Sequence, residues 1–351
     1  MSPDFAISND GSRWSPKHRQ MKIEIKQFNE EMIPRAGQLL AQRHKRDRLK
    51  YPLLPIRFEN AQIAEEAVRS TWQGKLRYGY AAFRSGQMIG YLIGEHVVQP
   101  WGRCGYVYLP GYALADGESA AILQDLYACL GDDWVGAGVF SHGLYVSAAN
   151  ENVIQALFNI GFGKERVDAM LDLRTLDIPD IEDPVGVTIR RAGKGDNEHL
   201  GNLSHIIMEA LSEPPYWHPT MPEDYPELRE GWSELADDSE WKVWLALEKG
   251  EALGCVGFLE KKEDDTDMLA VPKTIYLSVA ATSPQARGRG VANVLTWRGL
   301  DESRKDGFEI CYTNWINPNL LASRYWPRFG FKDVAYRLSK RVDPMISWTR
   351  R

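Results

Sequence analysis

The segment from Gln285 to Val291, with the sequence QARGRGV, has the composition of an anion-binding loop. Glycine lets the backbone approach an anion closely, because it has no Cβ. Two arginines add positive charge at the rim. If such a loop opens a helix, the unpaired N–H groups of the first turn and the positive end of the helix dipole point at the same anion. The segment therefore predicts a cradle for a phosphate or pyrophosphate group.

The residues on either side of this loop have the patterns of a strand and a helix. Residues 274–281 are rich in β-forming side chains and predict a strand. After the loop, apolar residues recur at helical spacing at Val291, Val294, Leu295 and Leu300. A strand that enters the loop and a helix that leaves it would hold the glycines at the helix N-terminus.

The chain contains an internal repeat of domain size. KIEIKQFNEEMIPRAGQLLAQRH, from Lys22, has a counterpart in VTIRRAGKGDNEHLGNLSHIIMEAL, from Val187, and both predict a strand followed by a helix. A predicted hairpin also recurs, with turns at Ser85-Gly86 and Lys249-Gly250. The spacing is kept at Ile25 and Ile189, at Gly90 and Gly254 (both 164 residues apart), and at Gly161 and Gly330 (169 apart). We infer a duplication.

The repeat divides the chain into two predicted domains, at residues 21–174 and 186–346. The connection at residues 175–185 carries proline and acidic residues, as linkers do. Residues 1–20 are polar and predict a disordered tail. Each domain combines strands with helices, so the expected fold class is α/β (α+β), with a mixed twisted sheet flanked by helices in each domain.

Bulk properties exclude several classes of protein. The 351 residues carry a formal net charge of -6, which gives no basic field for nucleic acid. No apolar run reaches the roughly 20 residues that cross a bilayer, and no signal peptide precedes the repeat. The seven histidines and four cysteines form no metal-binding motif. We expect a cytoplasmic protein with reduced thiols, without a metal and without a membrane or nucleic-acid partner.

Taken together, these motifs resemble the GNAT (GCN5-related N-acetyltransferase) superfamily in a tandem, two-domain form. Gln285-x-x-Gly288-x-Gly290 is similar to its acetyl-CoA motif. Asn319-Leu-Leu-Ala followed by Phe329-Gly-Phe is similar to its last helix, and residues 308–315 stand where its fifth strand belongs. The resemblance covers nearly all of the C-terminal domain and, more loosely, the N-terminal one. It implies acetyl-CoA as the acyl donor.

The resemblance also implies roles for individual residues. Backbone amides of the loop would hold the pyrophosphate, and a strand with a β-bulge would pair by its main chain with the pantetheine arm of the cofactor. The implied cofactor-binding residues are Val279, Ala281, Gln285, Ala286, Arg287, Gly288, Arg289, Gly290, Val291 and Asn319.

One position departs from the family pattern. The tyrosine that often protonates the leaving thiolate is replaced by Trp326, and its neighbour Tyr325 is the candidate acid. One residue on a helix turns a side chain by about 100°, so core packing of Tyr325 is an equal alternative. Glu260 is the candidate base for the ammonium proton, with a solvated surface glutamate as the alternative.

The stretch from Glu213 to Trp232 is rich in proline, aromatic and acidic residues. It follows the predicted first helix of the C-terminal domain, where substrate-binding residues usually lie in such folds. Tyr216, Trp217 and His218 are the candidate substrate-binding residues, for a cationic and partly apolar amine. An ordinary ordered loop that packs its aromatic rings is the alternative.

The corresponding loop of the N-terminal domain has lost the glycine motif. It contains Asp116-Gly117-Glu118, and two carboxylates would repel a pyrophosphate. Asn150 and Gly161-Phe162 keep the spacing of Asn319 and Gly330. We therefore expect this domain to keep the fold, to have lost the cofactor and to support structure or shape the substrate site.

The leading hypothesis is transfer of an acetyl group from acetyl-CoA to a primary amine of a small molecule. The alternative acceptor is a protein N-terminus or lysine, which would make the chain a protein N-acetyltransferase. An acyl-CoA-binding pseudoenzyme or regulatory module is a second hypothesis, favoured by Trp326 in the tyrosine position. An aminoacyl-tRNA-dependent transferase is a third, and the acidic net charge argues against it.

Overall fold

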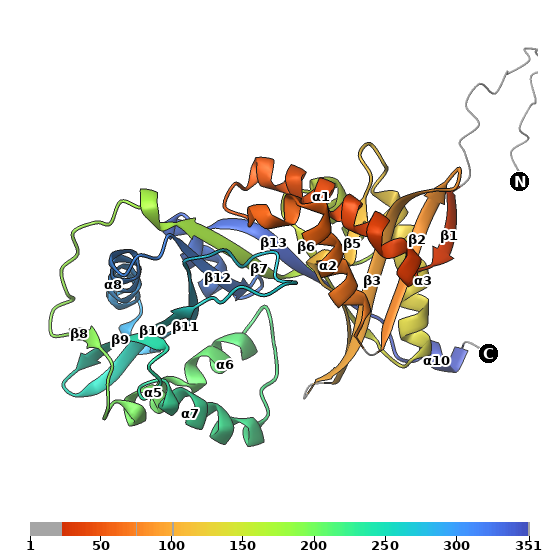
Figure 1. Ribbon diagram of the computed structural model, residues 1–351. Helices are drawn as coiled ribbons and strands as arrows, with labels where there is room; N and C mark the ends of the chain where they lie inside the picture. The colour runs from red at the N-terminus through yellow and green to blue at the C-terminus, as the bar shows by residue number, and fades with distance from the viewer. Residues whose placement is uncertain (1–22, 75, 100–101, 350–351) are drawn as a thin grey trace, which may run out of the picture.

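The computed structural model describes residues 23–74, 76–99 and 102–349. The tail predicted at residues 1–20 lies outside this range. Within the described residues, one mixed sheet of 13 strands has the order β1-β2-β3-β4-β6-β13-β7-β12-β11-β10-β9-β8, with β5 beside β3. Helices flank the sheet in both halves (Figure 1). The structure confirms the predicted α/β class.

The elements of the N-terminal half follow in chain order. They are β1 (Ile23–Gln27), α1 (Ile33–Lys50), α2 (Ala61–Trp72), β2 (Arg77–Arg84), β3 (Gln87–Gln99), β4 (Gly102–Val107), β5 (Tyr112–Leu114), α3 (Ala121–Gly136), β6 (Ser141–Ser147), α4 (Glu151–Phe158) and β7 (Gly163–Asp172).

The elements of the C-terminal half repeat much of this order. They are β8 (Thr188–Arg191), α5 (Asn197–Leu203), α6 (His205–Ser212), α7 (Tyr225–Glu234), β9 (Trp241–Glu248), β10 (Glu251–Glu260), β11 (Thr274–Thr282), α8 (Val291–Lys305), β12 (Ile310–Ile316), α9 (Leu320–Tyr325), β13 (Lys332–Arg341) and α10 (Ile346–Thr349).

The internal repeat appears in the strand order. β1-β2-β3-β4-β6 in one half corresponds to β8-β9-β10-β11-β12 in the other. Both predicted hairpin turns are present, and all four turn residues have positive φ, as hairpin turns of two residues require. The same order of strands therefore occurs twice, and the two copies share one sheet.

The two halves exchange strands at the centre of this sheet. β13, from the end of the chain, lies between β6 and β7 and pairs antiparallel with both. β7, from the N-terminal half, pairs antiparallel with β12. Figure 1 shows β7 and β13 between the two groups of helices. A boundary at residue 174 thus divides the sequence repeat, while β7 and β13 each complete the sheet of the other half.

The buried core continues across this exchange. Met170 of β7 and Tyr312 of β12 belong to the same hydrophobic cluster as the helices of the N-terminal half. Met268 and Leu269, from the connection between β10 and β11, also pack in that cluster and are 2% and 7% exposed. The C-terminal half therefore contributes side chains to the core of the N-terminal half.

Candidate active site

The predicted strand, loop and helix are confirmed as β11, residues 283–290 and α8. Gly288 and Gly290 have φ values of 76° and 82°, which favour glycine. A Cβ at either position would meet no described atom within 4 Å, so both glycines border open space. Gly290 is the N-cap of α8 and no side chain caps this helix. The first amides of α8 therefore face the loop without an intrahelical acceptor.

The two arginines of the loop have different surroundings. The Arg289 guanidinium donates to Glu248 Oε1 at 2.6 Å, so a carboxylate already balances its charge. Arg287 is exposed and lines a cleft beside the loop. Arg287 is thus the loop arginine that is placed to contact an anion in this cleft.

β11 has the predicted bulge and an open edge. Its register against β10 shifts between Leu277, which pairs with Phe258, and Val279, which pairs with Gly257. Ser278 is the extra residue. Pairing with the parallel strand β12 ends at Leu277 and Thr313. Residues 278–282, which include Val279 and Ala281, therefore have no strand partner on the β12 side, and their main chain can accept an added strand-like ligand.

A cleft of about 410 Å³ lies against the loop. It is lined by the end of α6, by Pro284 and Arg287 of the loop, and by residues 318–321 at the start of α9. Among the predicted site residues, the structure brings Tyr216, Arg287 and Asn319 together here. Glu209 and Glu213 line the same cleft, so two carboxylates face it beside one arginine.

Asn319 has a structural role that the sequence did not reveal. Its side-chain oxygen accepts from the N–H groups of Leu321 and Ala322, at 3.1 and 3.4 Å, and so caps α9. Asn150 caps α4 in the N-terminal half in the same way, with Val153 N–H at 3.1 Å. An asparagine at this position begins a helix in both halves, whether or not a cofactor binds. Contact of Asn319 with a cofactor stays a prediction.

Only one of the three predicted substrate-binding residues lines the cleft. Tyr216 does, and its ring stacks on that of His218 with the centroids 5.5 Å apart. The Tyr216 hydroxyl donates to Glu165 Oε1 at 3.4 Å. Trp217 is 67% exposed. The second part of this stretch forms α7, which the sequence interpretation missed although Pro226 stands in the first helical turn, where proline is favoured.

The two predicted catalytic residues lie apart from this cleft lining. The Tyr325 hydroxyl is 3.0 Å from the Thr296 hydroxyl, and burial raises the pKa of Tyr325. Trp326 is buried in the core with Phe331. Glu260 is exposed and pairs with Ile275 at the start of β11, whereas the loop follows the end of that strand. The structure does not bring Glu260 to the loop.

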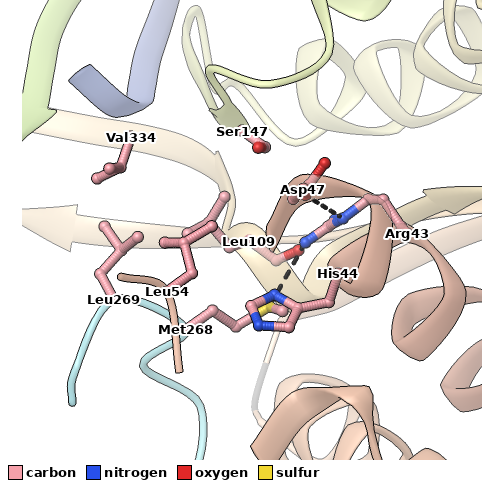
Figure 2. A pocket seen from close by; sticks show the side chains of 9 residues that line it. All are labelled: Arg43, His44, Asp47, Leu54, Leu109, Ser147, Met268, Leu269 and Val334. Atoms are coloured by element: carbon pink, nitrogen blue, oxygen red, sulfur yellow. Dashed lines mark hydrogen bonds and ion pairs between the residues drawn. The ribbon is translucent and has the colours of Figure 1, made fainter. Parts of the chain in front are cut away.

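The corresponding strand edge of the N-terminal half is closed. The Arg43 guanidinium donates to the carbonyl of Leu109, at 2.8 Å, and to that of Tyr112. The Ser147 N–H donates to the Tyr112 hydroxyl at 2.9 Å. Figure 2 shows Arg43, Leu109 and Ser147 with Met268 from the C-terminal half around a remaining cavity of about 10 Å³. That space is close to the size of one water molecule.

The loop of the N-terminal half also differs in charge from its counterpart. Asp116 forms an ion pair with Arg46. Glu118 forms one with Arg84 at 2.5 Å. Both carboxylates are thus held by arginines of the same half, and no glycine motif is present there.

Residues 205–331 match the sequence model of the acetyltransferase (GNAT) family. The C-terminal half carries a GNAT domain. This match contains the glycine loop, α6 and the start of α9, which are the elements around the cleft. No curated protein matches the chain.

Solved structures share the fold over both halves. A GCN5-related N-acetyltransferase from Sphaerobacter thermophilus is 17% identical, with a TM-score of 0.55, and the match covers 91% of this chain and 95% of that chain. The GCN5-related glucosamine N-acetyltransferase region of a fungal multi-domain GH3 beta-N-acetylglucosaminidase is 14% identical, with a TM-score of 0.55, over 91% of this chain and 38% of that chain. At these identities the likeness concerns the fold alone.

None of the helices in residues 23–349 that the structure describes combines the length and the apolar character needed to cross a membrane. In the same part of the chain, no three His, Cys, Asp or Glu side chains are grouped so that they could hold a metal ion.

Proposed function

We propose that the protein transfers the acetyl group of acetyl-CoA to a primary amine of a small molecule, in its C-terminal half. The observation that carries this proposal is that three features follow one another along the chain at residues 278–293, and that Pro284 and Arg287 within this stretch line the cleft. The three features are the open main-chain edge of β11, the glycine loop and the uncapped N-terminus of α8. An extended arm can pair with the strand edge while a pyrophosphate binds the helix N-terminus.

The N-terminal half would not bind acetyl-CoA in this proposal. Its equivalent edge is occupied by Arg43 and Tyr112 from within the half, and by Met268 from the other half. A pantetheine arm would have to displace a buried arginine, which would leave Asp47 without its partner. We therefore expect one acetyl-CoA site per chain.

The proposed reaction joins the amine nitrogen to the acetyl carbonyl carbon and breaks the bond from that carbon to sulfur. The nitrogen loses one proton and the thiolate of CoA gains one, so the reaction needs no metal or redox partner. Glu209 and Glu213 at the cleft would attract an ammonium form of the acceptor. Tyr325 stays the predicted proton donor, and core packing stays the alternative, because its hydroxyl contacts Thr296 and it does not line the cleft.

Calorimetric titration with acetyl-CoA tests the cofactor site. We expect one binding site in the wild-type protein and none in the double variant Gly288→Asp, Gly290→Asp. The variant places two carboxylates against the pyrophosphate and strains two residues of positive φ. An assay of free CoA, with a panel of primary amines, then tests transfer.

Gly86→Asp is the matched control. Gly86 also has positive φ, 80°, and also borders open space, but it lies in the hairpin of the N-terminal half. It should leave acetyl-CoA binding unchanged. Two sites in the wild-type protein would contradict the closed edge of the N-terminal half. Binding without transfer to any amine would favour the pseudoenzyme, which the buried Trp326 in the tyrosine position also supports.

A further inference from the structure

Strands β11 and β12 separate at a point that we call the strand fork, formed by residues 277–278 and 313–314. The parallel pairing of the two strands ends at Leu277 and Thr313, although both strands continue beyond these residues. Beyond the fork, β11 stays paired with β10, and β12 stays paired with β7. Pro284 follows the end of β11 and Pro318 follows the end of β12, and both line the cleft. The gap between the strands therefore opens from the fork toward the cleft.

The strand fork is where the acetyl end of a bound acetyl-CoA would lie. In the proposed binding mode, the pyrophosphate lies at the N-terminus of α8, which follows the end of β11, and the pantetheine arm follows the main chain of residues 278–282. Five extended residues span about 16 Å. The arm would thus run back along β11 until the pairing with β12 closes the gap. Side chains at the fork can therefore contact the reacting atoms.

Tyr276 leans across the strand fork. Its main chain pairs with Tyr312, but its hydroxyl accepts from Asn314 Nδ2 at 2.6 Å, and Asn314 lies two residues further along β12. Because the strands are parallel, this side chain leans from its own position toward the point where the strands separate. Tyr276 and Asn314 are both partly exposed. A hydrogen bond therefore holds the phenol oxygen beside the fork.

Tyr276 lies on the face of the sheet that an acceptor can approach. Its neighbours Ile275 and Leu277 pack in the cluster that contains α8, so Tyr276 points to the opposite face. After the bulge, Val279 and Ala281 pack on that opposite face with α5, α6 and α7. The two carboxylates that line the cleft at the end of α6 would attract an ammonium group. An acceptor held there would reach the thioester from the side of Tyr276.

The Tyr276 hydroxyl can still donate a proton. A phenol oxygen both donates and accepts, and Asn314 uses one of its acceptor positions. In residues 23–74, 76–99 and 102–349, no atom accepts the proton of Tyr276. The Tyr325 hydroxyl, in contrast, is 3.0 Å from the Thr296 hydroxyl, and Tyr325 packs in the cluster of α8. Tyr276 is thus the tyrosine with a free proton beside the fork.

We propose that Tyr276 is a catalytic residue of the acetyl transfer, a proton relay from the amine nitrogen to the CoA sulfur, and that Asn314 is its positioning residue. Once the nitrogen has bonded to the acetyl carbon, nitrogen and sulfur share one carbon, so one hydroxyl can lie beside both. The nitrogen gives a proton to the phenol oxygen, and the phenol proton passes to the sulfur. The carbon–sulfur bond breaks with its electron pair on sulfur.

The relay leaves Tyr276 neutral before and after the reaction, and the products are an amide and the thiol of CoA. One hydroxyl thus serves as proton acceptor and proton donor in the same step. This inference rests on the proposed acetyl transfer.

The first test is Tyr276→Phe, assayed with the primary amine of the panel that the wild type acetylates fastest. Loss of the hydroxyl should lower kcat by about 10²- to 10⁴-fold, the range for a positioned proton-transfer group. KM for acetyl-CoA and calorimetric binding of acetyl-CoA should be unchanged, which shows that the variant is folded. Tyr80→Phe is the matched control. The Tyr80 hydroxyl also makes a side-chain hydrogen bond, to Asp133 Oδ2 at 2.8 Å, but it lies on β2, so kcat should be unchanged.

Asn314→Asp tests the positioning role. An ionised aspartate cannot donate to the Tyr276 hydroxyl and would accept its proton, which turns that proton away from the sulfur. We expect kcat to fall relative to the wild type. A protonated aspartate can donate again, so the ratio of variant to wild-type kcat should rise as the pH is lowered. A merely structural role of Asn314 would give a ratio that does not follow protonation of the carboxyl group.

A crystal structure of the complex with acetyl-CoA tests the placement without an acceptor. We expect the sulfur atom to lie within hydrogen-bond reach of the Tyr276 hydroxyl. A sulfur atom beside Tyr325, on the α8 face, would overturn the inference whatever the kinetics.

The inference and the proposed function fail in different ways. If amines are acetylated and Tyr276→Phe keeps the wild-type kcat, or if only Tyr325→Phe lowers it, Tyr276 is not the relay and acetyl transfer stands. If the sulfur lies at Tyr276 but no amine is acetylated, the proposed function is wrong and the relay fails with it.

Discussion

Arg43 occupies the strand edge of the N-terminal half with its own hydrogen bonds. It is 2% exposed on α1, and it donates to two main-chain carbonyls beside β5 while Asp47 lies 3.4 Å away. Those carbonyls lie at the edge that corresponds to the open edge of β11 in the C-terminal half. The two terminal nitrogens of Arg43 have hydrogen-bond acceptors and its charge is paired with Asp47, so removing the arginine would leave a buried carboxylate without its ion pair. The difference between the halves is thus encoded in a few buried side chains.

His44, beside Arg43, should make stability depend on pH. Burial lowers the pKa of His44 to about 4, although its Nε2 lies 2.7 Å from the Pro55 carbonyl. An unfolded histidine binds a proton near pH 6.5, so the unfolded state gains protons first as the pH falls. We expect the free energy of unfolding to decrease by about 3 kcal/mol between pH 7 and pH 4 from this residue. Urea unfolding across this range measures it.

The variant His44→Gln isolates this contribution. Glutamine stays neutral throughout the range and can still donate to the Pro55 carbonyl. Asp47 has a raised pKa through burial, and its uptake of a proton favours the folded state at low pH, in the opposite direction. His142 has a lowered pKa and acts in the same direction as His44. Both groups remain in the variant, so equal pH slopes in the two proteins would refute the role of His44.

Helix α8 depends on a close approach to the sheet. A Cβ on Gly299 would lie 2.1 Å from the ring of Phe258, which is fully buried on β10. We expect Gly299→Ala to destabilise the protein by about 1–3 kcal/mol, as overpacking does. Because α8 begins at the glycine loop, its displacement should also weaken acetyl-CoA binding. Thermal unfolding and calorimetry measure the two effects.

Gly231→Ala on α7 is the control for helix propensity. A Cβ there would meet nothing within 4 Å. Alanine should stabilise this helix by up to about 1 kcal/mol, since it removes backbone freedom from the unfolded chain. If Gly299→Ala behaved like Gly231→Ala, the close packing of α8 would have no role in stability.

Local patterns predicted the elements that carry the glycine loop. The β-forming run of β11, the glycines and the apolar stripe of α8 are all properties of adjacent residues, and the structure confirms these elements. The contact between Glu165 and Arg337 could not be predicted in this way. They are 172 residues apart and meet only because β7 and β13 pair. The strand exchange could not be predicted from local patterns, because β7 and β13 each stand at the end of one repeat, as they would in two separate domains.

At the scale of the whole molecule, the exchange makes each half incomplete. β6 obtains its second neighbour, β13, from the end of the chain, and β12 obtains its second neighbour, β7, from the N-terminal half. Val167 and Ala169 of β7 are 1% and 0% exposed in the core of the C-terminal half. The sequence boundary near residue 174 and the physical boundary in the sheet therefore differ, and the two halves should fold as one cooperative unit.

Separate expression of residues 21–174 and 186–346 tests this unity. Each fragment would lack a central strand and would expose the apolar face and the hydrogen-bonding edge that this strand covers. We expect each fragment alone to be unfolded or aggregated, and the two together to form a 1:1 complex that binds acetyl-CoA. Circular dichroism and size-exclusion chromatography distinguish these states.

A cleaved chain provides the control, because it keeps both halves intact. Val185 is 96% exposed, so a protease site inserted between Val185 and Gly186 should be cut without disturbing the core. The cut protein should elute at the volume of the intact one, since β7 and β13 remain paired with the opposite half. Elution as two folded monomers would instead show that the halves are independent domains, and the pairing of β7 with β12 and of β13 with β6 would then not hold the halves together.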